Sequence, residues 1–261
     1  MTAVDQGGIV PWVRVVVATA RNGTERNEDV VGIDGWVLSA DSQGGPDEPI
    51  AMIRPFEVSL PISFRRPLVI ALADGMSGAP GGALAARIAA ETLTITRGDA
   101  MNRALAAAAF TEAHRRVREA SSAATEGMGC TAAMVSVHKD GAVVVANVGD
   151  VRVYRLIDGY AGQLTVDHRP ASGGGPATAV TRCVGGIREE PAEPHTFAAA
   201  LHPGNRLILC TDGVHDARDL TTVSKSLAAA SPGQAALDLL LAARERQAGD
   251  NATVVVVEIP R

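Results

Sequence analysis

The sequence predicts an α+β protein built from antiparallel β-sheets and a few amphipathic helices. Short strand-like runs are joined by Asp-Gly turns at 34–35, 140–141 and 158–159, which favours hairpins over a parallel sheet. Two Ala-rich segments, 82–96 and 101–120, place apolar residues at helical spacing. No repeat and no long linker divides the 261 residues, so we expect a single domain over 1–261.

The N-terminal half begins with strands. The β-branched run 13–20 predicts a strand, and residues 29–40 predict a hairpin. The wholly apolar run 68–73 is typical of a buried strand, and the two helices follow it. Residues 41–66 are richer in Pro and Gly and match no element.

The C-terminal half is dominated by further strands. A hairpin is predicted over 131–138 and 142–148. The other expected strands are 151–157, 163–166, 206–210 and 253–259. Helices are expected at 220–229 and 233–247, the second with a Ser-Pro start at 231–232. The glycine-rich stretch 170–180 predicts a loop.

Composition and charge exclude several classes of protein. The chain carries 24 basic and 29 acidic residues, with a sequence pI near 5.7, which argues against nucleic acid as a partner. The three cysteines form no Cys-x-x-Cys pair, which suits a reducing compartment and gives no zinc motif. We recognise no secretory signal and no apolar run near the roughly 20 residues of a membrane span. We therefore expect a cytoplasmic protein with no membrane partner.

Carboxylates recur at the ends of apolar strands. Asp74 and Asp212 each end an apolar run and precede Gly, whereas Asp250 comes just before a strand. Several converging carboxylates repel one another unless hard divalent cations lie between them. Asp-Gly is also the commonest hairpin turn, and the aspartates of the three turns named above fit that role alone. From composition alone, a metal site and a set of turns remain open alternatives.

Eight motifs, in this order, resemble those of the bacterial metal-dependent protein phosphatases, the type 2C serine/threonine family. They are RNGTERNED (21–29), ADGMSGAPGG (73–82), GCTAAMVSV (129–137), ANVGDVRVY (146–154), LTVDHR (164–169), VTRCVGG (180–186), PGNRLILCTDGVHD (203–216) and GDNATVVVV (249–257). Each motif alone is weak, but the ordered set is specific. The match runs from about residue 14 to residue 259.

The resemblance implies an α-β-β-α sandwich, two antiparallel sheets with helices outside, and two Mn²⁺ or Mg²⁺ ions, or three. Asp74 would bridge two metals with help from the Gly75 carbonyl, and Asp212 and Asp250 would hold one of them. Glu28 and Asp29 would support the site directly or through water. The residues that match the ligands of a third, looser ion are Asp150, Asp212 and Asp216.

The implied activity is hydrolysis of phosphoserine or phosphothreonine by a metal-activated water, with no protein nucleophile. Asp74, Asp212 and Asp250 would hold that water through the metals. A phosphorylated protein, a serine/threonine kinase or its target, would be the substrate, which places the chain in signalling.

Three departures from the family pattern stand out. The usual phosphate-clamping Arg is replaced by Thr24, which leaves Arg26 and Arg21 as candidates to bind phosphate. The family's flap, here 169–180, is strongly shortened, and 41–66 resembles an insertion. We expect the insertion to dock the substrate or to be a hairpin on a sheet edge. Thr24 and the short flap also leave open a non-catalytic pseudophosphatase that binds phosphoprotein as a regulatory module.

A serine hydrolase is the other enzyme class considered. Ser77 follows a strand, but residue 79 is Ala, so the G-x-S-x-G pattern fails. Nothing in the sequence orders the candidate bases His195, His202 and His215 into a triad.

Overall fold

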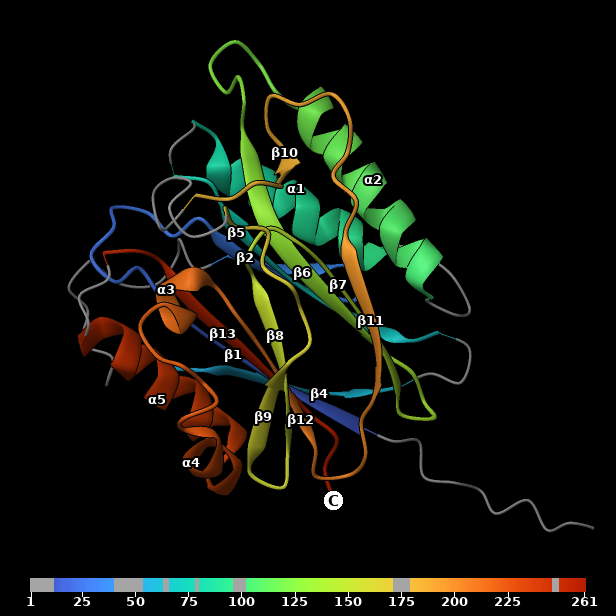
Figure 1. The fold of residues 1–261 in the computed structure, drawn as a ribbon, viewed down its shortest axis with the longest axis vertical. Helices are drawn as coiled ribbons and strands as arrows, with labels where there is room; N and C mark the ends of the chain where they lie inside the picture. The colour runs from blue at the N-terminus through green and yellow to red at the C-terminus, as the bar shows by residue number, and fades with distance from the viewer. Residues whose placement is uncertain are drawn as a thin grey trace, which may run out of the picture.

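Two antiparallel β-sheets stack face to face at the centre of the molecule, and helices cover both outer faces (Figure 1). The computed structural model describes residues 12–39, 54–62, 66–77, 80–95, 102–170, 179–245 and 249–261. The first sheet runs in the order β4 (Phe56–Pro61), β1 (Trp12–Ala20), β13 (Ala252–Glu258), β12 (Arg206–Cys210), β8 (Arg152–Ile157), β9 (Tyr160–Gln163). The second sheet runs β11 (His195–Ala200), β7 (Ala142–Val148), β6 (Gly129–Val137), β5 (Leu68–Gly75), β2 (Asp29–Ile33), β3 (Trp36–Ser39), with the short β10 (Val184–Gly185) beside β6.

The helices divide between the two outer faces. The second sheet is covered by α1 (Gly82–Ile95) and α2 (Arg103–Glu119). The first sheet is covered by α4 (Ser224–Ala229) and α5 (Pro232–Glu245), while α3 (Asp212–His215) is a single turn directly after β12. The expected α-β-β-α sandwich is therefore confirmed.

The core follows the two-residue period of the strands. Along β1, Val15 and Val17 face the space between the sheets, whereas Val16 faces the helical layer. The layer between the sheets is aliphatic, with Val, Leu and Ile from both sheets. Beneath α1 and α2 the side chains are mainly Ala, which lets these helices pack close to the second sheet.

Most predicted elements form among the described residues: α1 and α2 lie within the predicted ranges 82–96 and 101–120, and β2 and β3 make the hairpin predicted within 29–40. The turn residues Asp34 and Asp158 have φ of 47° and 49°, as expected of aspartates in tight hairpin turns. The strand expected at 163–166 is wrong, because β9 ends at Gln163. The helix expected from 220 begins only at Ser224, since Asp219 caps a turn with the backbone and hydroxyl of Thr221.

β4 and β11 were not predicted as individual strands, although a hairpin on a sheet edge was one of the two expectations for 41–66. β4 lies within 41–66 and pairs with β1 in register from Trp12↔Pro61 to Val17↔Phe56, so this part of the expected insertion is an edge strand of the first sheet. Ile62, which follows it, is 1 % exposed. Residues 40–53 and 63–65, and residues 171–178 of the expected flap, lie outside the described part of the chain.

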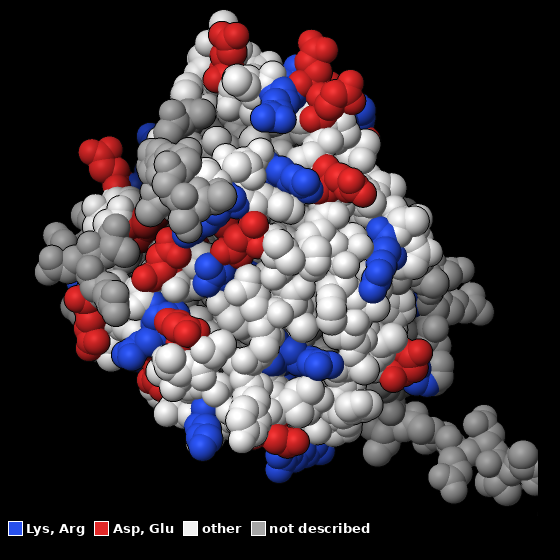
Figure 2. Space-filling view, viewed as in Figure 1, with Lys and Arg blue, Asp and Glu red and all other residues white. Residues whose placement is uncertain are grey.

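Charge is spread over the surface. On the face seen in Figure 2, Lys and Arg alternate with Asp and Glu, and no area of one sign dominates. None of the helices in the described ranges is long and apolar enough to cross a membrane.

Candidate metal centre

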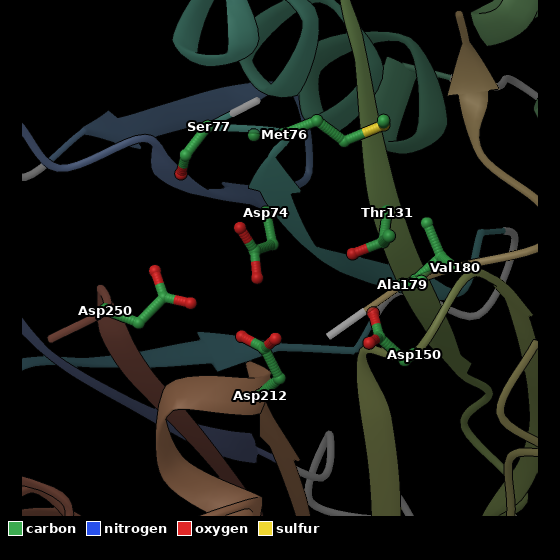
Figure 3. Close-up of a pocket in the computed structure, with 10 residues that line it drawn as sticks. Asp74, Met76, Ser77, Thr131, Asp150, Ala179, Val180, Asp212 and Asp250 are labelled. Carbon is green, nitrogen blue, oxygen red and sulfur yellow. The ribbon is translucent and has the colours of Figure 1, made fainter. Parts of the chain in front are cut away.

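Aspartates from four separate segments converge at one end of the sandwich: Asp74 near the end of β5, Asp150 after β7, Asp212 at the start of α3 and Asp250 before β13. Figure 3 shows Asp74, Asp212 and Asp250 pointing toward one another, with Asp150 beside them. They lie around a cavity of about 470 Å³. The described residues that line it are Asp74, Gly75, Met76, Ser77, Thr131, Asp150, Ala179, Val180, Asp212 and Asp250.

Strand pairing brings these residues together. In the second sheet β2 pairs with β5 so that Asp29 lies directly opposite Asp74. In the first sheet β12 pairs with β13, which places the start of α3, at Asp212, beside the residues that precede β13. The ends of these strands in the two sheets border the same cavity. The hydrogen bonds of Asp29 join one sheet to the other. Asp29 Oδ2 accepts from Thr253 Oγ1 at 2.6 Å and from Thr211 Oγ1 at 3.2 Å.

Glycine is needed where β5 meets α1. A Cβ at Gly75 would lie 2.5 Å from the backbone carbon of Gly82, and a Cβ at Gly82 would lie 2.9 Å from Glu28 Oε2. Any side chain at either position would push the helix away from the strand end. The Asp74-Gly75 pair therefore lets the start of α1 pack beside the carboxylates.

Burial and mutual repulsion raise the pKa values of these carboxylates. Burial, with repulsion from Asp250 and Asp212, raises the pKa of Asp29 to about 7. Burial and four neighbouring aspartates, Asp29 first, raise the pKa of Asp74 well above its ordinary value. Burial and the charge of Asp250 raise the pKa of Asp212 to about 6, and burial also raises those of Asp250 and Glu28.

Several carboxylate oxygens are buried without a hydrogen-bond donor. They are Glu28 Oε2, Asp29 Oδ1 and Asp212 Oδ1. Buried acceptors normally have partners, and an all-oxygen set of this kind suits Mg²⁺ or Mn²⁺. Among the residues described, no three His, Cys, Asp or Glu side chains are disposed to hold one ion by themselves. Water and backbone carbonyls would complete the shell, as they commonly do for Mg²⁺.

The predicted site residues fall into three groups. Asp74, Gly75, Asp150, Asp212 and Asp250 line the cavity. Glu28 and Asp29 lie beside it: Asp29 is buried, and Glu28 is hydrogen-bonded to Ser77. Asp216 is exposed, and Arg26 and Arg21 are not among the described lining residues.

The departure at Thr24 has a local structural role. The Thr24 hydroxyl lies 2.7 Å from the carbonyl oxygen of Arg21 and 2.8 Å from that of Arg26, so it closes the turn between them. Asn251, which is 3 % exposed, accepts from the Glu28 backbone N–H at 2.8 Å and donates to the Arg26 carbonyl at 2.9 Å. The loop before Glu28 is thereby fixed to the residue after Asp250.

Sequence reasoning missed Asn251 and also Arg169, whose guanidinium meets three of the predicted ligands. The distances are 2.8 Å from Arg169 Nε to Asp150 Oδ2, 2.9 Å from Nη2 to Asp216 Oδ2 and 3.5 Å from Nη2 to Asp212 Oδ2. The one available signal for Arg169 was its place at the end of LTVDHR (164–169), one of the motifs that resemble the family's.

The serine-hydrolase alternative finds no support in this geometry. Ser77 lies on the cavity, but its partner is Glu28, and no histidine is among the described lining residues. His215 instead contacts Asp216 and the backbone carbonyl of Asp150.

The chain thus combines two stacked sheets flanked by helices with an acidic cavity at one end of the sandwich. The family model described as protein phosphatase 2C matches residues 63–245, and the chain belongs to that family. No curated protein was similar enough in sequence to match the chain.

Solved structures of bacterial phosphatases share the fold. PppA, described as a key regulatory component of the T6SS in Pseudomonas aeruginosa, is 23 % identical with a TM-score of 0.71, covering 95 % of this chain and 98 % of that one. The serine/threonine phosphatase of S. agalactiae is 21 % identical with a TM-score of 0.73, over 95 % and 99 % of the two chains. The catalytic domain of the serine/threonine phosphatase PstP, solved with two manganese ions, is 23 % identical with a TM-score of 0.66, over 96 % and 100 %.

Proposed function

We propose that this protein is a metal-dependent serine/threonine protein phosphatase that uses Mn²⁺ or Mg²⁺. The observation that carries the proposal is the convergence of Asp74, Asp212 and Asp250 on one cavity, with carboxylate oxygens buried beside it that have no donor. Without a cation in this cavity, the repulsion between these carboxylates would destabilise the folded protein and serve no function. The structure of PstP with two manganese ions supports the same assignment.

The chain's own residues would share the work as follows. Asp74, Asp212 and Asp250 would hold the ions, with Glu28 and Asp29 behind them. Bound divalent cations supply a water of lowered pKa and screen the negative charge of the phosphoryl group.

The cavity walls suit a phosphorylated side chain. Met76, Ala179 and Val180 give the cavity apolar sides next to its acidic floor. The substrate would be a phosphoserine or phosphothreonine that protrudes from a protein, such as a kinase or its target, and enters this cavity. Arg26 would attract its phosphate from the rim. The three free thiols fit a reducing compartment such as the cytoplasm.

A non-catalytic module that binds phosphoprotein is the second candidate, and Thr24 favours it. Thr24 is engaged in its own turn at the position where the family's phosphate clamp is expected. A regulatory role is also what the description of PppA states for that protein.

Hydrolysis and binding of a phosphothreonine peptide separate the two candidates. An enzyme releases phosphate from the peptide and from p-nitrophenyl phosphate in the presence of Mn²⁺. A binding module retains the peptide, detectable by fluorescence anisotropy, and releases no phosphate. The second outcome would overturn the proposed activity.

A further inference from the structure

Arg169 occupies the centre of an acidic triad at the edge of the metal centre. Its Nε is 2.8 Å from Asp150 Oδ2, and its Nη1 and Nη2 lie 3.1 Å and 2.9 Å from the two oxygens of Asp216. Nη2 is also 3.5 Å from Asp212 Oδ2. One guanidinium thus contacts all three carboxylates that the family resemblance would assign to a third, looser ion.

The ion pair between Arg169 and Asp150 is largely buried. The Arg169 side chain is 18 % exposed, and its partner Asp150 is 4 % exposed. A buried carboxylate needs a partner, and the two-pronged contact with Asp216 is the geometry that guanidinium favours over other cations. Both oxygens of Asp216 are thereby held by the same guanidinium.

The surrounding backbone holds Arg169 in this position. His168 N–H donates to the Gly149 carbonyl at 2.9 Å, and Gly149 N–H donates to His168 Nδ1 at 3.0 Å. Burial and the charge of Arg182 lower the pKa of His168 to about 4, so its ring is neutral and Nδ1 is a good acceptor. This reciprocal pair fixes the residue before Arg169 to the residue before Asp150.

The acidic partners are fixed as well. His215 is buried, with Nε2 2.9 Å from the Asp150 carbonyl oxygen and Nδ1 3.0 Å from Asp216 Oδ1. His215 therefore links the backbone of Asp150 to the carboxylate of Asp216 through the turn of α3. The triad surrounds the guanidinium, and His215 holds two of its three members, Asp150 by the backbone and Asp216 by the carboxylate.

We propose that Arg169 is the permanent cation of the Asp150–Asp212–Asp216 triad, so that this protein binds two divalent cations and has no third metal site. The inference rests on the proposed function, because it concerns the number of ions that function would use. A guanidinium cannot lose its proton in a protein and carries no ligand oxygens. A divalent cation on the same oxygens would have to displace it against charge repulsion. Because the guanidinium is part of the chain, it compensates the charge of these three carboxylates at any metal concentration.

Counting bound Mn²⁺ on the full chain tests the proposal without reference to activity. Metal is removed with EDTA and dialysis, Mn²⁺ is added in excess, and the unbound ion is measured by its electron paramagnetic resonance signal. We expect two bound ions per chain for the unaltered protein and three for Arg169→Ser. Arg116→Ser, a control on an exposed arginine of α2 that pairs with Glu112, is expected to keep two.

A second variant covers the case in which Arg169→Ser does not fold, which circular dichroism would reveal. Asp216→Asn with Arg169 intact is expected to retain two ions, because in the unaltered protein the carboxylate of Asp216 binds the guanidinium and not a metal ion. Loss of one ion in this variant would overturn the proposal. Three ions on the unaltered chain, or only two on a folded Arg169→Ser, would overturn it while leaving the proposed function in place. No bound Mn²⁺ on any variant would overturn both.

Discussion

Asp29 and Asp74 are direct cross-strand neighbours, paired in the antiparallel register of β2 and β5. Side chains at such positions share one face of the sheet and lie close enough to interact, and like charges there destabilise the pair. Asp29 is 2 % exposed, and burial places both pKa values above their ordinary range. The pair is favourable only when protons or cations neutralise it.

The stability of the metal-free protein is therefore expected to fall as the pH rises. The pKa of Asp29 is about 7 and that of Asp212 about 6 in the folded chain, against an ordinary 3.8. Between about pH 4 and pH 7 the folded state binds more protons than the unfolded state, so the free energy of unfolding decreases with pH in this window. Each unit by which a pKa differs between the folded and unfolded states changes the free energy of unfolding by about 1.4 kcal/mol, which amounts to several degrees in Tm.

Differential scanning calorimetry in EDTA at pH 5.5 and pH 8 checks this expectation. We expect the lower Tm at pH 8, and a recovery when Mn²⁺ is added, because the ion replaces the protons. The pairing of Asp216 with Arg169 does not interfere, because its pKa of about 2 lies below this range. A Tm that rises from pH 5.5 to pH 8 without metal would contradict the account.

Asp74→Asn is expected to reduce turnover by at least about a thousandfold, because Asp74 is the carboxylate most surrounded by other acids. The fold should survive, and the metal-free Tm at pH 8 should rise, since one repelling charge has gone. Asp158→Asn is the matched control: Asp158 belongs to a hairpin turn at φ 49°, which Asn also tolerates. Equal losses of activity in the two variants, measured on a phosphothreonine peptide, would remove Asp74 from the site.

Arg26→Ala is expected to raise KM for a phosphopeptide about tenfold with a smaller change in kcat. Arg26 is exposed, and its charge lowers the pKa of Glu28, so its field reaches the metal centre. Arg21 is already engaged, with Nη1 3.1 Å from the Glu25 carbonyl oxygen, so Arg21→Ala should have the smaller effect on KM. Steady-state kinetics on both variants measures KM and kcat. A larger rise in KM for Arg21→Ala than for Arg26→Ala would assign phosphate binding to Arg21 instead.

Part of the segment expected to be an insertion is structural. Ile62→Ala should lower the free energy of unfolding by about 2–5 kcal/mol, because the side chain is fully buried in the layer between the sheets. Phe56→Ala in the same segment is the control, since Phe56 is 45 % exposed and should cost less than half as much. Urea unfolding measures both. A docking role for residues 41–53 of that segment stays a prediction and is tested best by replacing them while leaving β4 intact.

From the sequence we could predict carboxylates that converge on the cavity where the signal was local, and we missed their partners where it was not. Asp74 and Asp212 each follow an apolar run and precede Gly, so strand, turn and carboxylate can be read from a few consecutive residues. The ion pairs of Arg169 span 19 residues to Asp150 and 47 to Asp216, and no local pattern reports them. Asn251 likewise acts on a loop 223 residues away.

The fold shows the same division. β1, β5 and β12 are apolar runs that no other element fits, and they form as predicted. β4 reads FEVSLP, half exposed and ending in Pro, a composition that an edge strand tolerates but that does not distinguish it from a loop. Only its pairing with β1 makes it a strand.

The most direct measurement is the rate of phosphate release from a phosphothreonine peptide by one preparation, first after exhaustive chelation and then after Mn²⁺ is restored. The account predicts no release in the first state and full turnover in the second, reached once two ions are bound per chain. Undiminished turnover after chelation would contradict a metal-dependent site at Asp74, Asp212 and Asp250. So would the absence of turnover in a chain that has bound both ions.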